Sequence, residues 1–174
     1  MKKISLILVL ASVLFTFINA QTVEFNKFLA NDGVAHDQFG YSVATSGNYA
    51  IVGAHQNNSQ GSSSGSAYIF ENDGGTWIQT AKLEPSDGSE DDEFGFSVDI
   101  DGNYAVVGAY MDDDNGDESG SAYIFYNNAG TWEEIAKITA SDGETEDYFG
   151  YSVAISGNYI LIGAYGDDDN GPLS

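Results

Sequence analysis

The sequence predicts an all-β protein built from blades of a β-propeller. Residues 31–85, aligned without gaps on residues 86–140, share 28 identities in 55 positions, and an incomplete third copy covers 141–174. Each copy contains short apolar segments separated by turns rich in glycine and asparagine, and helical periodicity is absent after residue 20. Four-stranded units of about this length are typical of propeller blades.

The second copy shows the expected strands most clearly. In order, they are predicted at 95–100, 104–109, 121–126 and 132–139. Asp101, Gly102 and Asn103 form the first turn, where glycine and asparagine suit a tight hairpin. The second strand is apolar on both faces, as in a strand buried between neighbours. A stacked β-solenoid is the alternative, but its repeats are normally shorter, and hairpin turns favour antiparallel units.

The number of repeats is small for a closed propeller. Residues 21–174 make about 2.8 units, whereas closed propellers have about 4–8 blades. Residues 22–30 match the end of a fourth strand, because Lys27-Phe28 aligns with Lys82-Leu83, and we expect them to belong to a preceding or ring-closing blade. We therefore expect a segment of a larger propeller; the alternative is a short chain that assembles with copies of itself.

The first twenty residues have the pattern of a secretory signal peptide. Lys2 and Lys3 precede an apolar run over 4–18, and Ala20 provides the small residue before the predicted cleavage site. We therefore expect a secreted or cell-surface protein that does not insert into a membrane after cleavage.

The net charge of the chain after residue 20 limits the classes of partner that it can bind. This part holds three lysines, no arginine and 27 acids, a formal charge of −24. Nucleic acid is excluded as a partner, because binding it requires cationic side chains to neutralise phosphates. The absence of cysteine excludes disulfides and thiol chemistry.

Three recurring blocks resemble the FG-GAP repeat family, the blades of integrin α-subunit propellers and of many secreted bacterial surface proteins. Phe39-Gly40-Tyr41-Ser42-Val43 recurs at 94–98 and 149–153, and Gly53-Ala54 and 65–70 recur likewise. The resemblance implies a propeller, usually of seven blades, that acts in extracellular recognition or adhesion. The proline of the family's Gly-Ala-Pro is replaced here by His55, Tyr110 and Tyr165.

The resemblance also implies a calcium loop between the first two strands of a blade. Here that loop has shrunk to a tight turn, and only the second copy keeps two carboxylates, Asp99 and Asp101. Since Ca²⁺ takes six to eight oxygen ligands, this inherited site is expected to be lost in most blades.

A second calcium candidate is the loop that follows the second strand. Its oxygen-bearing residues are Asp112, Asp113, Asp114, Asn115 and Asp117 in the second copy, and Asp167, Asp168, Asp169 and Asn170 in the third. Alternating oxygens before a glycine resemble a calcium loop, although Met111 and Gly166 occupy its first position. A solvated acidic loop is the alternative. Calcium is the one cofactor the sequence suggests.

Other residues that recur between the copies of the repeat are expected to have structural roles. Asp37, Asp92 and Asp147 precede each Phe-Gly pair and are expected to cap backbone amides. The serines of the Phe-Gly block recur in every copy, and no triad partner is visible for them, so no catalytic residue is predicted. Trp77 and Trp132 would suit sugar stacking or, as the alternative, packing between blades.

The sequence therefore predicts a binding or adhesion module. Its ligand, an extracellular protein or glycan, is expected at the long loops over 55–64, 110–119 and 165–174. The alternatives are an accessory propeller of a secreted enzyme whose catalytic domain lies beyond residue 174, and a self-assembling structural propeller.

Overall fold

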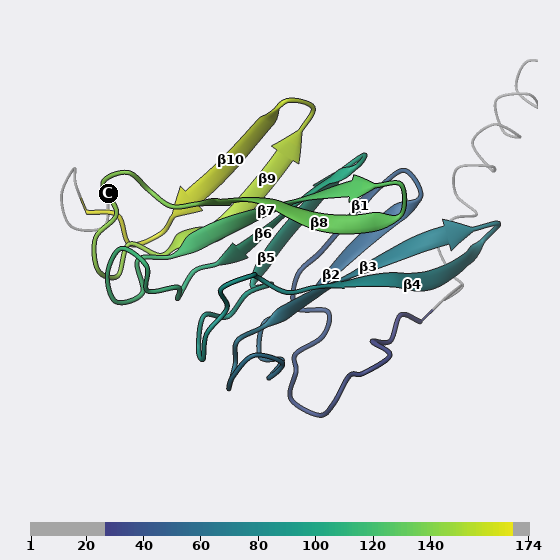
Figure 1. Ribbon diagram of the computed structural model, residues 1–174, viewed down its shortest axis with the longest axis horizontal. Coiled ribbons are helices and arrows are strands. Elements are labelled where there is room, and N and C mark those ends of the chain that lie inside the picture. The colour runs from purple at the N-terminus through teal and green to yellow at the C-terminus, as the bar shows by residue number, and fades with distance from the viewer. Residues whose placement is uncertain (1–26, 169–174) are drawn as a thin grey trace, which may run out of the picture.

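A computed structural model describes residues 27–168 of the chain (Figure 1). The strands of this part are β1 (Val43–Ser46), β2 (Tyr49–Ala54), β3 (Ser66–Asp73), β4 (Thr76–Leu83), β5 (Ser97–Asp101), β6 (Tyr104–Ala109), β7 (Ser121–Asn128), β8 (Thr131–Ile138), β9 (Phe149–Ser156) and β10 (Tyr159–Ala164). The all-β prediction is confirmed.

The strands form three antiparallel sheets that follow the sequence repeat. Strands β1–β4 make one four-stranded sheet, β5–β8 make a second, and β9 pairs with β10. We call these sheets blade 1, blade 2 and blade 3. The register is the same in both complete blades, since Val52 pairs with Tyr68 as Val107 pairs with Tyr123. Four-stranded antiparallel sheets of this kind are expected of propeller blades.

The predicted turn after the first strand is present in every blade. Gly47, Gly102 and Gly157 each have a φ of 57°, a left-handed conformation that glycine adopts without strain. The three hairpins therefore turn in the same way, and the first two strands of each blade occupy equivalent positions.

The blades pack face to face in chain order (Figure 1). Strand β5 contacts β1 and β2, and β9 contacts β5 and β6. Apolar side chains fill the space between blades 1 and 2. Buried members from blade 1 include Ile51, Ile69 and Leu83, and those from blade 2 include Phe94 and Val107. Strand β2 is apolar on both faces because each face meets a different layer of side chains.

A close contact at the first two strands of each blade, which we call the joint, connects each blade to the next. Ser42 Oγ donates a hydrogen bond of 2.8 Å to the carbonyl oxygen of Gly95 in the next blade. That carbonyl lies where a Cβ of Gly53 would be, so no larger residue fits there. Ser97, Gly150 and Gly108 repeat the arrangement between blades 2 and 3 with a 2.7 Å bond. These recurring glycines and serines thus join the blades.

The N-terminal expectations fall largely outside this part of the chain. The predicted signal peptide and residues 22–26 lie outside the described residues. Residues 27–30 are not part of a strand, but Phe28 stacks on Phe70 with ring centroids 4.8 Å apart. Nowhere in 27–168 is there a helix with the length and apolar character needed to cross a bilayer.

Candidate functional site

The acidic loop of blade 2 is folded around one buried carboxylate. Asp112, only 3% exposed, follows β6. Its Oδ1 accepts a hydrogen bond from Ser121 Oγ and its Oδ2 accepts one from the Tyr123 hydroxyl, each at 2.9 Å. The solvated acidic loop considered above therefore does not describe Asp112.

The cation beside Asp112 is a lysine of the same blade. Lys137 Nζ, on β8, lies 2.9 Å from Asp112, 2.7 Å from Asp114 and 2.8 Å from Asp87. Burial lowers the pKa of Lys137, but its hydrogen bonds to the three carboxylates outweigh burial and raise that pKa. An ammonium group thus occupies the centre of this acidic cluster.

Three other predicted calcium ligands of this loop form hydrogen bonds within the loop or to the segment before blade 3. Asp113 Oδ1 accepts a 2.8 Å bond from the Glu118 amide, and Asn115 Nδ2 donates to the Ala140 carbonyl at 3.2 Å. The Asp117 carbonyl accepts from the Glu146 amide at 2.9 Å, which ties blade 2 to the segment before blade 3.

The corresponding loop of blade 3 is only partly described. Asp167 and Asp168 follow β10, whereas Asp169 and Asn170 lie outside the described residues. Between residues 27 and 168, no three His, Cys, Asp or Glu side chains are grouped so as to hold a metal ion. Calcium binding stays a prediction.

The remaining calcium candidates link neighbouring blades. Asp99 Oδ2 accepts a 2.8 Å hydrogen bond from the Ile155 amide. Asp101 Oδ2 accepts one of 2.7 Å from the Gly157 amide. Asp99 therefore bonds strand β9 of blade 3, and Asp101 bonds the turn that follows β9.

The aspartates before each Phe-Gly pair cap the backbone, as predicted. The Oδ2 atoms of Asp37, Asp92 and Asp147 accept bonds of 2.6–2.9 Å from the amide three residues earlier in the chain. Burial of Asp92, with a smaller contribution from the Asp112 charge, raises the pKa of Asp92 to about 6.

Blade 1 contains a less charged version of the same cluster. Asn57 replaces Asp112, and Lys82 replaces Lys137. Lys82 Nζ lies 2.8 Å from Asp32 and 3.0 Å from Glu84, two carboxylates that are far more exposed than Asp112, and 3.3 Å from Asn57 Oδ1. Since an amide suffices beside Lys82, the blade does not need a buried carboxylate at this position.

A row of aromatic rings crosses all three blades on the side where these loops begin. Each blade contributes two rings: one follows the Phe-Gly pair, and the other follows Gly-Ala. The members are Tyr41, Phe96, Tyr151, His55, Tyr110 and Tyr165, which we call the aromatic row. The Phe96 ring lies 4.9 Å from Tyr41, 4.3 Å from Tyr110 and 5.0 Å from Tyr151.

The two ends of the aromatic row are accessible. Tyr41 is 53% exposed and Tyr165 is 65% exposed, whereas His55 is buried, with its ring 4.2 Å from Tyr41 and 5.5 Å from Phe96. Burial lowers the pKa of His55, so its ring is neutral at pH 7. The sequence showed His55, Tyr110 and Tyr165 as departures from Gly-Ala-Pro and Tyr41 as part of the recurring Phe-Gly block; the recurrence of aromatic residues at two positions was the signal available.

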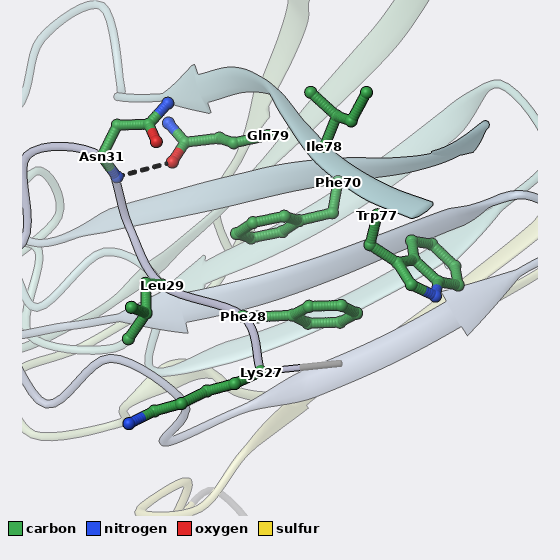
Figure 2. Close-up of a pocket in the computed structure, with 8 residues that line it drawn as sticks. All are labelled: Lys27, Phe28, Leu29, Asn31, Phe70, Trp77, Ile78 and Gln79. Carbon is green, nitrogen blue, oxygen red and sulfur yellow. Dashed lines mark hydrogen bonds between the residues drawn. The ribbon is translucent and has the colours of Figure 1, made fainter. Parts of the chain in front are cut away.

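The two tryptophans pack rather than form open platforms. The Trp77 ring lies 5.4 Å from Phe28, edge to face, beside the hollow drawn in Figure 2. The Trp132 ring lies 5.8 Å from Tyr49 of the preceding blade. The packing interpretation of Trp77 and Trp132 fits these contacts.

A comparison with family models agrees with the repeat. The model described as FG-GAP repeat matches residues 22–70, 77–125 and 132–174. No match was found among curated proteins. The segment over 77–125 begins within β4 and ends within β7, so it combines the outer strand of blade 1 with the first three strands of blade 2.

Proposed function

Because the chain belongs to the FG-GAP repeat family, we propose that it is a secreted or cell-surface binding module. Its ligand, an extracellular protein or glycan, contacts the aromatic row and the loops that start beside it. The observation that carries this proposal is the unbroken series of ring contacts across three blades, with Tyr41, Tyr151 and Tyr165 exposed along it.

The chemistry of the aromatic row suits recognition. Tyrosine offers a flat apolar face and a hydroxyl that exchanges hydrogen bonds, which is why it is enriched in binding surfaces. Tyr41, Tyr151 and Tyr165 keep 53%, 38% and 65% of their surface exposed. The rings support one another, so little side-chain entropy remains to be lost when a ligand binds.

The loops beside the row are tied to the third strands of their blades by hydrogen bonds and differ in sequence between blades. His55 and Tyr110 begin the loops over 55–64 and 110–119, and Asp112 anchors the second of these to Lys137. A rigid scaffold with variable loops allows specificity without catalysis. We accordingly propose a role in binding or adhesion and not in catalysis.

Binding assays on single-residue variants test the proposal. The purified protein is applied to a glycan array and to immobilised extracellular matrix proteins, and each detected interaction is repeated with Tyr41→Ala and Tyr165→Ala. We expect the dissociation constant to rise about tenfold or more for each, the effect of losing an aromatic anchor.

Tyr104→Ala is the matched control. Tyr104 is 42% exposed and contacts Tyr126, away from the aromatic row. Equal affinity for wild type, control and row variants would overturn the proposed site. Hydrolysis of an array glycan, abolished by one substitution, would instead establish an enzyme.

A further inference from the structure

One pair of ionisable side chains lies within the aromatic row. His55, which follows β2, has its Nε2 atom 3.8 Å from Oε2 of Glu93, in the segment before β5. The side chains are only 4% and 14% exposed. The Nδ1 atom of His55 is buried, and within residues 27–168 it has no hydrogen-bond partner. The contact between blades 1 and 2 therefore encloses an imidazole and a carboxylate that are too far apart for a hydrogen bond.

The repeat supplies a comparison for this pair. Tyr110 and Tyr148 are the equivalents of His55 and Glu93 in the contact between blades 2 and 3. Their rings also meet, with centroids 5.8 Å apart. The same two positions thus face each other in both contacts. In the described part of the chain, only the first contact has groups there whose ordinary pKa values, 6.5 for His55 and 4.5 for Glu93, lie between 4 and 7.

The backbone does not explain why a glutamate stands at position 93. Gln38, Glu93 and Tyr148 occupy one repeat position and have left-handed φ angles of 54°, 54° and 56°, a conformation that suits glycine or asparagine better. Three unrelated side chains share this conformation, so the turn does not need a carboxylate. The contacts of the Glu93 carboxylate are with His55 and with the Tyr110 hydroxyl, which donates a hydrogen bond to it.

The pair touches aromatic rings on both sides. The His55 ring lies 4.2 Å from Tyr41 and 5.5 Å from Phe96, between centroids. Glu93 holds the hydroxyl of Tyr110, whose ring lies 4.3 Å from Phe96. Because close-packed side chains leave little free space, a change in the position of His55 or Glu93 has to move rings of the aromatic row.

Two aspartates and a tyrosine hydroxyl also act on the pair. Burial lowers the pKa of His55. Burial raises the pKa of Glu93, the hydrogen bond from Tyr110 lowers it, and the charge of Asp91 raises it. Asp37 adjoins His55, since its carbonyl oxygen accepts a 3.3 Å bond from the next amide in the chain. Its carboxylate, however, already accepts bonds from a backbone amide and an asparagine side chain. Glu93 is therefore the carboxylate available to a protonated His55.

We infer that the His55–Glu93 pair makes the aromatic row respond to pH, an inference that rests on the binding role proposed above. When His55 takes up a proton, both ring nitrogens carry hydrogen, and Nδ1 lacks an acceptor among the described residues. The imidazolium moves toward Glu93 until the gap of 3.8 Å closes to a charge-assisted hydrogen bond of about 2.8 Å. Tyr41 loses the ring that it packs against, and Tyr110 shares its acceptor.

The affinity of the row for its ligand therefore falls in acid. The ligand meets the arrangement of rings that exists with a neutral His55, and the protonated pair replaces that arrangement. By linkage, the bound ligand also makes protonation of His55 less favourable. His55 is thus a positioning residue of the binding surface, and it acts through the rings of Tyr41 and Tyr110.

Nuclear magnetic resonance on the full chain tests the movement without a ligand. Between pH 7.5 and 4.5, the His55 ring protons should titrate with a midpoint below 6.5, the ordinary pKa of histidine. The ring protons of Tyr41 and Tyr110 should shift with the same midpoint. A His55 ring that does not titrate, or tyrosine rings that stay constant while it does, would overturn the inference.

Two variants sharpen this measurement. Glu93→Gln, which copies Gln38 of blade 1, keeps an acceptor for Tyr110 and removes the charge, so the midpoint of His55 should fall further. His36→Asn is the matched control. His36 is exposed and has a φ of 80°, which asparagine tolerates, so the tyrosine shifts should be the same as in wild type. An unchanged midpoint in Glu93→Gln would contradict the role of the carboxylate.

Binding at two pH values tests the consequence. The probe is the array glycan or matrix protein whose binding Tyr41→Ala weakens. Its dissociation constant should be about fivefold or more higher at pH 5 than at pH 7, the low end of usual coupling between two sites. His55→Tyr, which copies Tyr110, should bind it equally at both pH values. His55→Gln takes its place if circular dichroism shows that His55→Tyr is unfolded.

The outcomes separate this inference from the proposed function. A wild type whose affinity for the probe is the same at pH 5 and pH 7, or a histidine variant that keeps the full pH dependence, overturns the inference and leaves the binding surface standing. If no array glycan or matrix protein depends on Tyr41, the proposed function fails, and the tyrosine shifts alone decide whether the pair moves the rings.

Discussion

At the residue scale, the three lysines after residue 20 are one repeat position with a defined role. Lys82 and Lys137 each bind side chains from two loops, 50 and 25 residues earlier in the chain: Lys82 binds Asp32 and Asn57, and Lys137 binds Asp87 and Asp112. The acidic side chains therefore do not all simply repel one another. In blade 2 the carboxylates converge on one ammonium group, and the buried partner Asp112 makes that interaction important for folding.

Lys137→Met should be markedly destabilising. It leaves the buried Asp112 carboxylate without its cation, and removing one partner of a buried pair costs about 3–5 kcal/mol. Lys82→Met should cost only about 1 kcal/mol, because its acidic partners are exposed and Asn57 is neutral. Urea unfolding measures both. Asp112→Asn should rescue Lys137→Met, since blade 1 already has an asparagine there; equal losses for the two lysines would contradict this account.

Asp92 should make stability fall as the pH rises. Its folded pKa, about 6, lies above its ordinary value of 3.8, so the folded state holds the proton more tightly than the unfolded state. Stability from this group is complete below pH 4 and is lost as the pH rises through 6. Asp92→Asn keeps the acceptor for the Ser89 amide and removes the titration.

The measurement is urea unfolding of wild type and Asp92→Asn across pH 4 to 7. Relative to wild type, the variant should gain about 1–2 kcal/mol over this interval. Glu90→Gln, an exposed acid nearby, serves as the control and should change little. A constant difference between Asp92→Asn and wild type at all pH values would refute the raised pKa.

At the scale of elements, the joint between blades explains which repeat positions stay constant. Gly53 in β2 and Gly108 in β6 each admit a carbonyl of the next blade, and Ser42 and Ser97 donate hydrogen bonds to those carbonyls. These groups approach so closely that a methyl group cannot be added without moving the blades.

Gly108→Ala and Gly163→Ala form a matched pair for this joint. A Cβ on Gly108 would overlap the Gly150 carbonyl, whereas one on Gly163 would meet only the movable hydroxyl of Ser152. We expect a loss of about 1–3 kcal/mol for Gly108→Ala and a smaller one for Gly163→Ala. Chemical denaturation of both variants tests the difference; losses of the same size would argue against the joint.

At the scale of the whole molecule, charge and packing act in opposite directions. Face-to-face blades bury the apolar layers, while the formal charge of −24 after residue 20 repels itself across the surface. This net charge already counts the three lysines, so the ammonium group of Lys137 offsets nearby acids in blade 2 without lowering the total further. Cations from solution are the remaining way to relieve it.

The calcium hypothesis predicts a higher melting temperature with Ca²⁺ than with chelator. A ligand that binds only the folded state stabilises it, and about 1 kcal/mol corresponds to about 2–4 °C for a chain of this size. Ionic strength must be held constant with NaCl, because screening alone stabilises an acidic protein. Equal melting temperatures under these conditions would remove the hypothesis.

The amino-acid sequence by itself determined the repeat, the order of the strands and their turns. It did so because these depend on local patterns: apolar segments a few residues long, and glycine or asparagine at each hairpin. Strands β6 and β10, for example, both begin at the tyrosine and end at the alanine of the same repeated segment. The capping role of Asp37 and its equivalents was also predictable, since the amide that each caps lies three residues away.

Only the tertiary structure decided what the acidic loops and the aromatic residues do. Lys137 meets Asp87 from 50 residues away, and Phe96 meets Tyr41 and Tyr151 from two other blades. Such contacts depend on how one sheet is placed against the next, which no local pattern encodes. The same placement leaves Val43 and Leu161 exposed while it buries their equivalents, because burial depends on the neighbouring blade and not on the residue itself.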